Sequence, residues 1–191
     1  MTNSDCDITT KPLDVYDQIS DITITKNKIY IVNSNGQIAF GDKIDYAWEP
    51  LSQQLSWTFA SAEYSLCSNL DNIIIAYQPQ GGKKYISHNE GETWNLIESN
   101  YFSTEAAKFI YKYNKFFCFV NNTILYSANG INWTQITYDG SIVANDILQS
   151  GDLYIICGNN GKIIYSNGFI IWHELSNFTE NHLQAIIFNG E

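Results

Sequence analysis

The stretch YIICGNNGKIIYSNGFIIW, residues 154–172, joins two short apolar segments through Gly and Asn and ends in a Ser/Asn/Gly turn and a tryptophan. Related stretches end at three earlier tryptophans, Trp48, Trp94 and Trp133. Trp94, Trp133 and Trp172 follow one another at intervals of 39 residues. A repeat of about 40 residues that is built from strands is typical of the blades of a β-propeller.

Each copy of the repeat contains the four short strands that a blade requires. In the last complete copy we expect strands at 143–148, 153–157, 162–165 and 171–175, joined by hairpin links rich in Gly and Asn. Residues 103–113 come nearest to a helical pattern, but their place in the repeat favours a strand. The sequence therefore predicts an all-β fold, a small β-propeller of four to five blades with four antiparallel strands in each.

The repeats also predict how the chain is divided. Residues 1–12 are expected to form a flexible arm and residues 13–191 a single propeller domain. The copies cover roughly 18–52, 61–99, 104–138 and 141–178, and a partial copy covers 182–191. The first strand of a fifth copy is expected at 183–188. Blades bury their faces only against neighbours, so two ways of completing the array stay open: a closed ring in which residues 13–19 join the last strand, or closure by a second chain or a larger assembly.

Residues 87–94, SHNEGETW, resemble the Asp-box of bacterial neuraminidase repeats, Ser-x-Asp-x-Gly-x-Thr-Trp, with Asn89 in place of the aspartate. Shorter forms of this hairpin occupy 127–133 and 166–172. We expect Ser and Asx side chains to bond to turn amides, Gly to take the left-handed conformation and Trp to pack beneath the hairpin. The residues with this structural role are Ser87, Asn89, Gly91, Trp94, Ser127, Asn129, Gly130, Trp133, Ser166, Gly168 and Trp172.

The repeat pattern of residues 154–172 is also similar to propellers of bacteriophage tail and host-adhesion proteins and of photosystem II assembly factors. This resemblance covers about residues 21–191 and implies the fold more than a function. It implies a virion location if the protein is viral, and otherwise a cytoplasmic one, because no signal-peptide pattern opens the sequence.

Charge and composition exclude several functions. The net charge is -10, and all ten basic residues are lysines, so nucleic-acid binding is disfavoured. No apolar run is long enough to insert into a membrane. The chain has four cysteines, Cys6, Cys67, Cys118 and Cys157. They lack metal-ligand spacing and are expected to be small buried side chains, so no metal, cofactor or disulfide framework is predicted.

Enzymatic function is not expected. Sialidases, in which the Asp-box is best known, hold the substrate carboxylate with three arginines, and this chain has none. Nothing in the sequence pairs two carboxylates as glycosidases require; the candidates are Glu63, Glu98, Glu105, Asp139, Asp146 and Glu174. The three histidines, His88, His173 and His182, show no metal-ligand spacing, and no nucleophile motif is present.

A binding or assembly function remains. The irregular loops contain aromatic rings beside amides, the residue types that carbohydrate recognition uses: Trp57, Phe59, Gln78, Gln80, Tyr101 and Phe102. Alternatively, these rings fill gaps between blades. The sequence thus predicts a non-catalytic module, most simply a phage tail or baseplate protein that binds protein partners, self-associates or attaches to a cell-surface glycan. A cytoplasmic assembly factor or a lectin-like propeller is the alternative.

Overall fold

The computed structural model describes residues 18–43, 48–51, 55–57, 63–98, 106–175 and 179–189. The chain divides into two compact units, residues 1–97 and 98–191, and each is considered by itself. The predicted arm at residues 1–12 and most of the segment 13–19 lie outside the described residues, and so do the predicted site residues Phe59, Tyr101 and Phe102.

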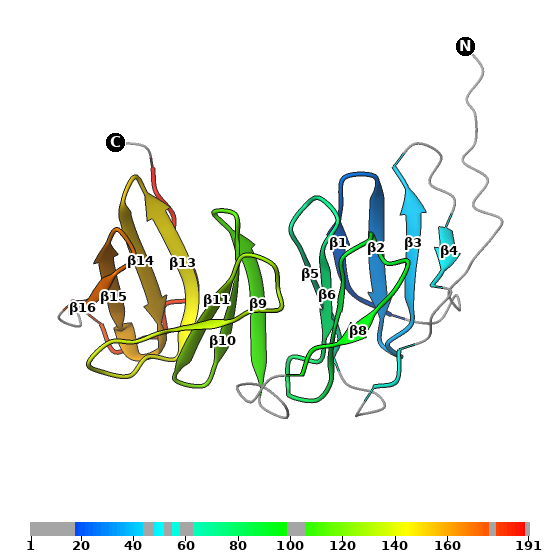
Figure 1. Ribbon diagram of the computed structural model, residues 1–191. Coiled ribbons are helices and arrows are strands. Elements are labelled where there is room, and N and C mark those ends of the chain that lie inside the picture. Colours follow the sequence, from blue (N-terminus) through cyan, green and yellow to red (C-terminus); the bar gives the residue numbers. More distant parts are fainter. Residues whose placement is uncertain are drawn as a thin grey trace, which may run out of the picture. The chain divides into compact units, whose positions relative to one another are not determined.

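The first unit consists of two four-stranded antiparallel sheets, blade 1 and blade 2 (Figure 1). In both sheets the strands lie in chain order. Blade 1 contains β1 (Ile19–Ile24), β2 (Lys28–Asn33), β3 (Ile38–Asp42) and β4 (Trp48–Pro50). Blade 2 contains β5 (Ser65–Ser68), β6 (Ile74–Tyr77), β7 (Lys84–Ser87) and β8 (Asn95–Leu96).

The second unit has the same organisation. Blade 3 contains β9 (Ala107–Lys112), β10 (Lys115–Val120), β11 (Thr123–Ser127) and β12 (Thr134–Ile136). Blade 4 contains β13 (Ala144–Ser150), β14 (Leu153–Gly158), β15 (Ile163–Asn167) and β16 (Ile171–Leu175), with a 3-10 turn at Asn159–Gly161. The prediction of an all-β fold with four-stranded antiparallel blades is confirmed, and within the stretch 103–113 the structure has strand β9 as expected.

Each blade has two faces, because side chains alternate along a strand and cross-strand partners share a side. We call the face that carries Ile31 in blade 1 and Ile156 in blade 4 the preceding face, because in blade 4 it packs on blade 3, and we call the opposite face the following face, because in blade 1 it packs on blade 2. In the first unit the following face of blade 1 packs on blade 2 through a core of Tyr30, Val32, Ile38, Leu66, Ile74, Ala76, Tyr85 and Trp94, with Tyr64 beside it. In the second unit blade 3 packs on the preceding face of blade 4 through Phe117, Phe119, Ile124, Ile147, Ile156, Ile164 and Trp172.

The second strands of blades 2 and 3 are buried, as their apolar runs predict. All four residues of β6 are buried, and so are five of the six in β10. Cys67, Cys118 and Cys157 are buried free thiols, which confirms the expected packing role for these three, whereas Cys6 lies outside the described residues.

The expectation of a strand at residues 183–188 is wrong. We call residues 179–189 the tail, and it is irregular throughout. A strand exists only where its backbone groups form a ladder with a neighbour, and no described strand lies in register beside this segment. The tail is nevertheless attached to blade 4, where the Leu183 N–H donates to the Gly158 carbonyl at 3.0 Å.

Candidate interaction surfaces

The serine turns of blades 2 and 3 have the hydrogen bonds that their sequences predict. The Ser87 hydroxyl accepts the Gly91 N–H at 2.8 Å, and the side-chain oxygen Oδ1 of Asn89 accepts the Thr93 N–H at 3.0 Å. The Trp94 Nε1–H then donates to the Gly91 carbonyl at 3.0 Å. Gly91 has a φ of 76°, the left-handed conformation that favours glycine. These side chains hold their own hairpin and are engaged within it.

Blade 3 repeats this arrangement and blade 4 departs from it. Ser127 accepts the Gly130 N–H at 2.9 Å, and Trp133 donates to the Gly130 carbonyl at 3.0 Å. The equivalent Ser166 is fully buried, yet its hydroxyl has no hydrogen-bond partner among the described residues. Blade 4 lacks the Asx residue two positions after the serine, where Gly168 stands instead. Its hairpin is filled by Phe169, whose ring packs edge-on against Trp172 at 5.4 Å.

Trp57 is a packing residue in the first unit. Its Nε1–H donates to the Gly36 carbonyl at 2.8 Å, and its ring lies 5.0 Å from Tyr64 and 5.3 Å from Tyr85, both edge-on. An added Cβ on Gly36 would lie 2.5 Å from Trp57 Nε1, so this glycine is required for the close approach. The contacts match the alternative that the ring fills a gap between blades, and the Trp57 side chain is half-buried against the core of the first unit.

The two glutamines of the neighbouring loop differ in exposure. Gln78 is fully buried, so the exposed amide expected from the sequence is not available at the surface at this position. Gln80 lies at the surface, where its Nε2 donates to Glu63 Oε2 at 2.6 Å. The structure brings Trp57 and Tyr85 together in one cluster, but among the predicted residues that it describes, Trp57, Gln78 and Gln80, it does not assemble one exposed site.

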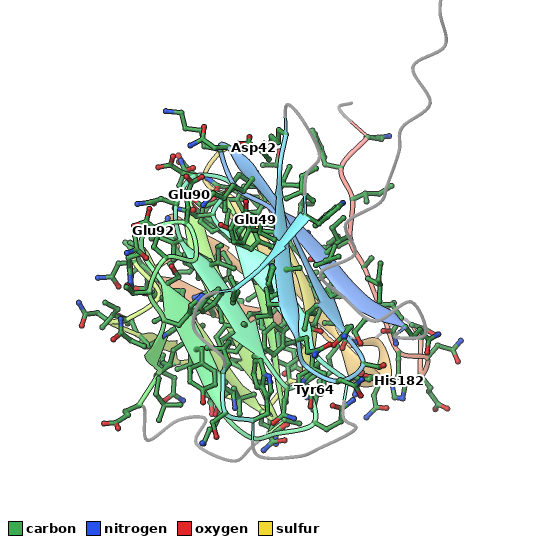
Figure 2. All side chains as sticks on the ribbon, turned by 90° about the vertical axis from the view of Figure 1, so that its right-hand side faces the viewer. Asp42, Glu49, Tyr64, Glu90, Glu92 and His182 are labelled. Carbon is green, nitrogen blue, oxygen red and sulfur yellow. The ribbon has the colours of Figure 1, made fainter. Side chains whose placement is uncertain are left out.

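Acidic side chains gather at one end of blades 1 and 2. Figure 2 shows Asp42, Glu49, Glu90 and Glu92 toward this end, with Tyr64 toward the other. Burial by itself raises the pKa of Glu90, but hydrogen bonds from Asn27, including the side-chain bond at 2.9 Å, outweigh it and hold the pKa below its ordinary value.

The Tyr30 hydroxyl donates to the Glu90 carbonyl, which ties blade 1 to the blade 2 hairpin. Burial, and then Glu90 and Glu92, raise the pKa of Tyr30 above its ordinary value. Glu90 is therefore hydrogen-bonded within the first unit, and the four carboxylates together supply a negative field at this end.

On the preceding face of blade 1, strand β1 has exposed apolar side chains, whereas Ile31 and Ala39, which share this face by register, are buried. Three isoleucines of β1, which we call the isoleucine row, are exposed: Ile19, Ile22 and Ile24. Blade 4 provides the comparison, because β1 and β13 share a register shift directly before an Asp-Ile pair. At this equivalent position Ile147 is 0% exposed and Ile22 is 59% exposed.

The following face of blade 4 carries the tail. Asp146 Oδ1 accepts the Ile147 N–H at 2.9 Å and the Lys112 ammonium at 2.5 Å, while its Oδ2 accepts the Ile186 N–H of the tail at 3.3 Å. His182 also contacts blade 4, where its Nδ1 accepts the Asn160 N–H at 3.1 Å. Farther along the tail, Ile187 is 87% exposed and Phe188 is 54% exposed.

The tail is seated as a first strand of a further blade would be. In the first unit Asp21 Oδ1 accepts the Ile22 N–H at 2.8 Å and Oδ2 accepts the Leu66 N–H of β5 at 2.9 Å. Asp146 makes the same pair of bonds to its own strand and to the tail. The Asp-Ile pairs Asp21-Ile22 and Asp146-Ile147, at equivalent strand positions, are the sequence signal that could have revealed this joint.

No group of three or more His, Cys, Asp or Glu side chains that could hold a metal ion occurs within the described ranges. His173 and His182 are exposed and His88 is half-buried. Burial, and then the charge of Asp21, raises the pKa of Cys67 to about 12, and burial, and then the charge of Asp146, raises the pKa of Cys157. The one helix in the described ranges, the short turn Asn159–Gly161, is too brief to cross a membrane, and no other candidate span is found there.

Comparison with solved structures identifies propellers of low sequence identity. The chain is similar to YCF48 bound to D1 peptide, with a TM-score of 0.56 and 13% identity over 86% of this chain and 56% of that one. It is similar to YCF48 from Cyanidioschyzon merolae, with a TM-score of 0.57 and 16% identity over 93% and 62%. It is also similar to a chain in a crystal structure of a nidogen/laminin complex, with a TM-score of 0.60 and 11% identity over 95% and 73%.

These similarities concern the fold alone, because the identities are low. No family model and no curated protein matches the sequence. The chain spans less than two thirds of the two YCF48 chains, 56% and 62% of their lengths. The β-propeller class predicted from the repeat is confirmed, whereas the resemblance to Asp-box and phage-tail proteins stays a prediction.

Proposed function

We propose that this protein is a non-catalytic, protein-binding β-propeller module that binds a protein partner through the preceding face of blade 1. The observation that carries the proposal is the exposure of Ile22, 59%, at the position where blade 4 buries Ile147 completely. An apolar sheet face built to receive a blade is a natural site for another protein surface.

Two further observations support this proposal. Similar solved propellers include one bound to a peptide and one in a protein complex. The loop residues that would favour a small ligand are engaged within the protein, since Trp57 is held by Gly36 and Gln78 is buried. Function in propellers depends on the surface that is presented rather than on the fold, and in the first unit that surface is the isoleucine row.

A narrower form of the proposal places the module in a phage tail or baseplate, as a relative of the Asp-box repeats. The serine turns of blades 2 and 3 support the Asp-box relation, because their hydrogen bonds are those that the motif implies. Immunoblotting of purified particles from a host of the source phage tests the location. Absence of the protein from intact particles would refute this narrower form.

The experiment for the broader proposal is affinity purification of tagged chain from the cells that produce it, followed by cross-linking from the exposed Lys26 at the end of β1. Three forms are compared: wild type, Ile22→Asp and Ile170→Asp. Ile170 is 80% exposed on the outer hairpin of blade 4 and serves as the matched control.

We expect a partner that cross-links to Lys26, that is lost with Ile22→Asp and that is retained with Ile170→Asp. An aspartate in the isoleucine row would have to be desolvated in the complex, which is costly for an unpaired charge. A partner that binds equally well to all three forms would show that the preceding face of blade 1 is not the binding surface.

A further inference from the structure

The exposed faces of blades 1 and 4 are matching halves of one type of joint. The register pairs Ile22 with Ile31 in blade 1 and Ile147 with Ile156 in blade 4, so these two pairs are equivalent. In blade 4 the pair forms the preceding face and packs on blade 3. The isoleucine row of blade 1 is thus the half of a joint that normally receives a following face.

The other half is found on blade 4. Residues Ile155 and Ile163 of its following face are equivalent by register to Tyr30 and Ile38 of blade 1. Tyr30 and Ile38 are buried beneath blade 2, whereas Ile155 and Ile163 remain half-buried. The following face of blade 4 therefore has apolar area that a further blade would cover.

The tail binds to the following side of blade 4 where the first strand of a further blade would lie. Its Ile186 is held by Asp146 as Leu66 is held by Asp21, and the Thr179 carbonyl lies so close to Gly161 that an added Cβ would meet it at 1.9 Å. Thr179 of the tail therefore approaches Gly161 of blade 4 as Trp57 approaches Gly36 of blade 1. With the tail seated in this way, Ile187 and Phe188 add exposed apolar area to the following side of blade 4.

We propose that the partner is a second copy of this chain, bound head to tail: the isoleucine row of one copy packs on the following face of blade 4 and the tail of the other. The inference rests on the proposed protein-binding function and names its partner. Within each unit, the following face of one blade packs on the preceding face of the next blade. This chain has one further face of each kind, on blade 1 and on blade 4. Two copies that exchange both contacts form a closed pair, whereas copies that exchange only one contact form a growing chain.

The test is size-exclusion chromatography with light scattering on the purified chain and three variants: Ile22→Asp, Ile187→Asp and the control Ile170→Asp. For wild type and Ile170→Asp we expect about twice the chain mass of 21.7 kDa. For Ile22→Asp and Ile187→Asp alone we expect the monomer mass. Circular dichroism and thermal melting confirm that the variants are folded, which is expected because all three side chains are exposed.

Mixing the two interface variants gives the decisive readout. In an equimolar mixture of Ile22→Asp and Ile187→Asp, the intact tail of the first meets the intact isoleucine row of the second, so one good contact is restored. We expect the mixture to recover a pair at concentrations where each variant alone is a monomer. A dimer that only Ile22→Asp disrupts, or a mixture that stays monomeric, would overturn the head-to-tail contact.

The outcomes separate this inference from the proposed function. A monomeric wild type that still captures a partner through Ile22 refutes the second copy and leaves the protein-binding function standing. A monomeric wild type with no Ile22-dependent partner refutes both. Wild-type oligomers larger than a dimer would support the contact if both Ile22→Asp and Ile187→Asp abolish them. The copies would then form a growing chain in place of a closed pair.

Discussion

Replacing Ser127 and Ser166 by alanine tests whether the serine turn stabilises a blade through its hydroxyl. The two residues lie 39 positions apart in the same unit, and they are 2% and 0% exposed. The Ser127 hydroxyl accepts the buried Gly130 N–H at 2.9 Å and donates to Asn129 at 3.1 Å. The Ser166 hydroxyl has no partner among the described residues.

The expected effects have opposite signs. Ser127→Ala leaves the Gly130 N–H buried without an acceptor, which costs about 1–3 kcal/mol. Ser166→Ala removes a hydroxyl that is desolvated without compensation, so its effect should lie between no change and a gain of about 1 kcal/mol. At about 2–4 °C per kcal/mol for a chain of this size, Ser127→Ala should lower the melting temperature by roughly 2–12 °C.

The assay is urea and thermal unfolding of both variants, followed by intrinsic fluorescence and circular dichroism. Ser87→Ala in blade 2 provides a second instance of the bonded turn, because Ser87 accepts the Gly91 N–H at 2.8 Å. A Ser166→Ala variant that loses as much stability as Ser127→Ala would refute the reasoning, since volume and burial would then matter and the hydrogen bond would not.

Three further predictions follow from single contacts. Gly91→Ala should destabilise the protein more than Gly151→Ala in urea unfolding. Both glycines have positive φ, but only at Gly91 would the added Cβ approach Tyr30, at 2.9 Å. Equal losses of stability would show that the clash with Tyr30 contributes nothing. The folded chain keeps the Cys67 thiol neutral up to about pH 12, whereas the unfolded chain ionises it above its ordinary pKa of 9.0. This group should therefore make stability fall as the pH rises from 9 toward 12, and Cys67→Ala should show a shallower decline; an unchanged slope would contradict the assignment. Asp146→Asn weakens the charge-assisted acceptor for Lys112 and for the Ile186 amide, so hydrogen exchange at Ile186 should accelerate while amides of β14 and β15 keep their rates; an unaltered rate at Ile186 would show that other contacts hold the tail.

Local features of the sequence predicted the serine turns well. Ser127, Asn129 and Gly130 are within four residues of one another, so their hydrogen bonds depend on the hairpin alone. The departure of blade 4 could also be anticipated in part, because the sequence places Gly168 where the other turns have Asn. With Gly168 at that position, Ser166 lacks the Asx side-chain oxygen to which Ser127 donates.

Contacts distant in sequence explain where the reasoning about loops fell short. The sequence predicts Trp57 as an exposed ring in an irregular loop, but Gly36 and Tyr85, 21 and 28 residues away, hold it half-buried against the core. Gln78 has a polar side chain and is nevertheless fully buried. Which loop side chains point inward depends on the neighbouring blade, and a pattern of residue types does not contain that information.

The sequence by itself determined the blades, because a strand repeat near 40 residues can bury its apolar runs only by stacking sheets side by side. It also placed the start of a fifth repeat at residues 183–188. Only the tertiary structure decided that this segment is seated on Asp146 without forming a strand, and that Ile22 is exposed where Ile147 is buried. Both outcomes depend on whether a neighbouring sheet supplies a hydrogen-bond ladder and an apolar face, which is a property of the assembled blades and not of any single repeat.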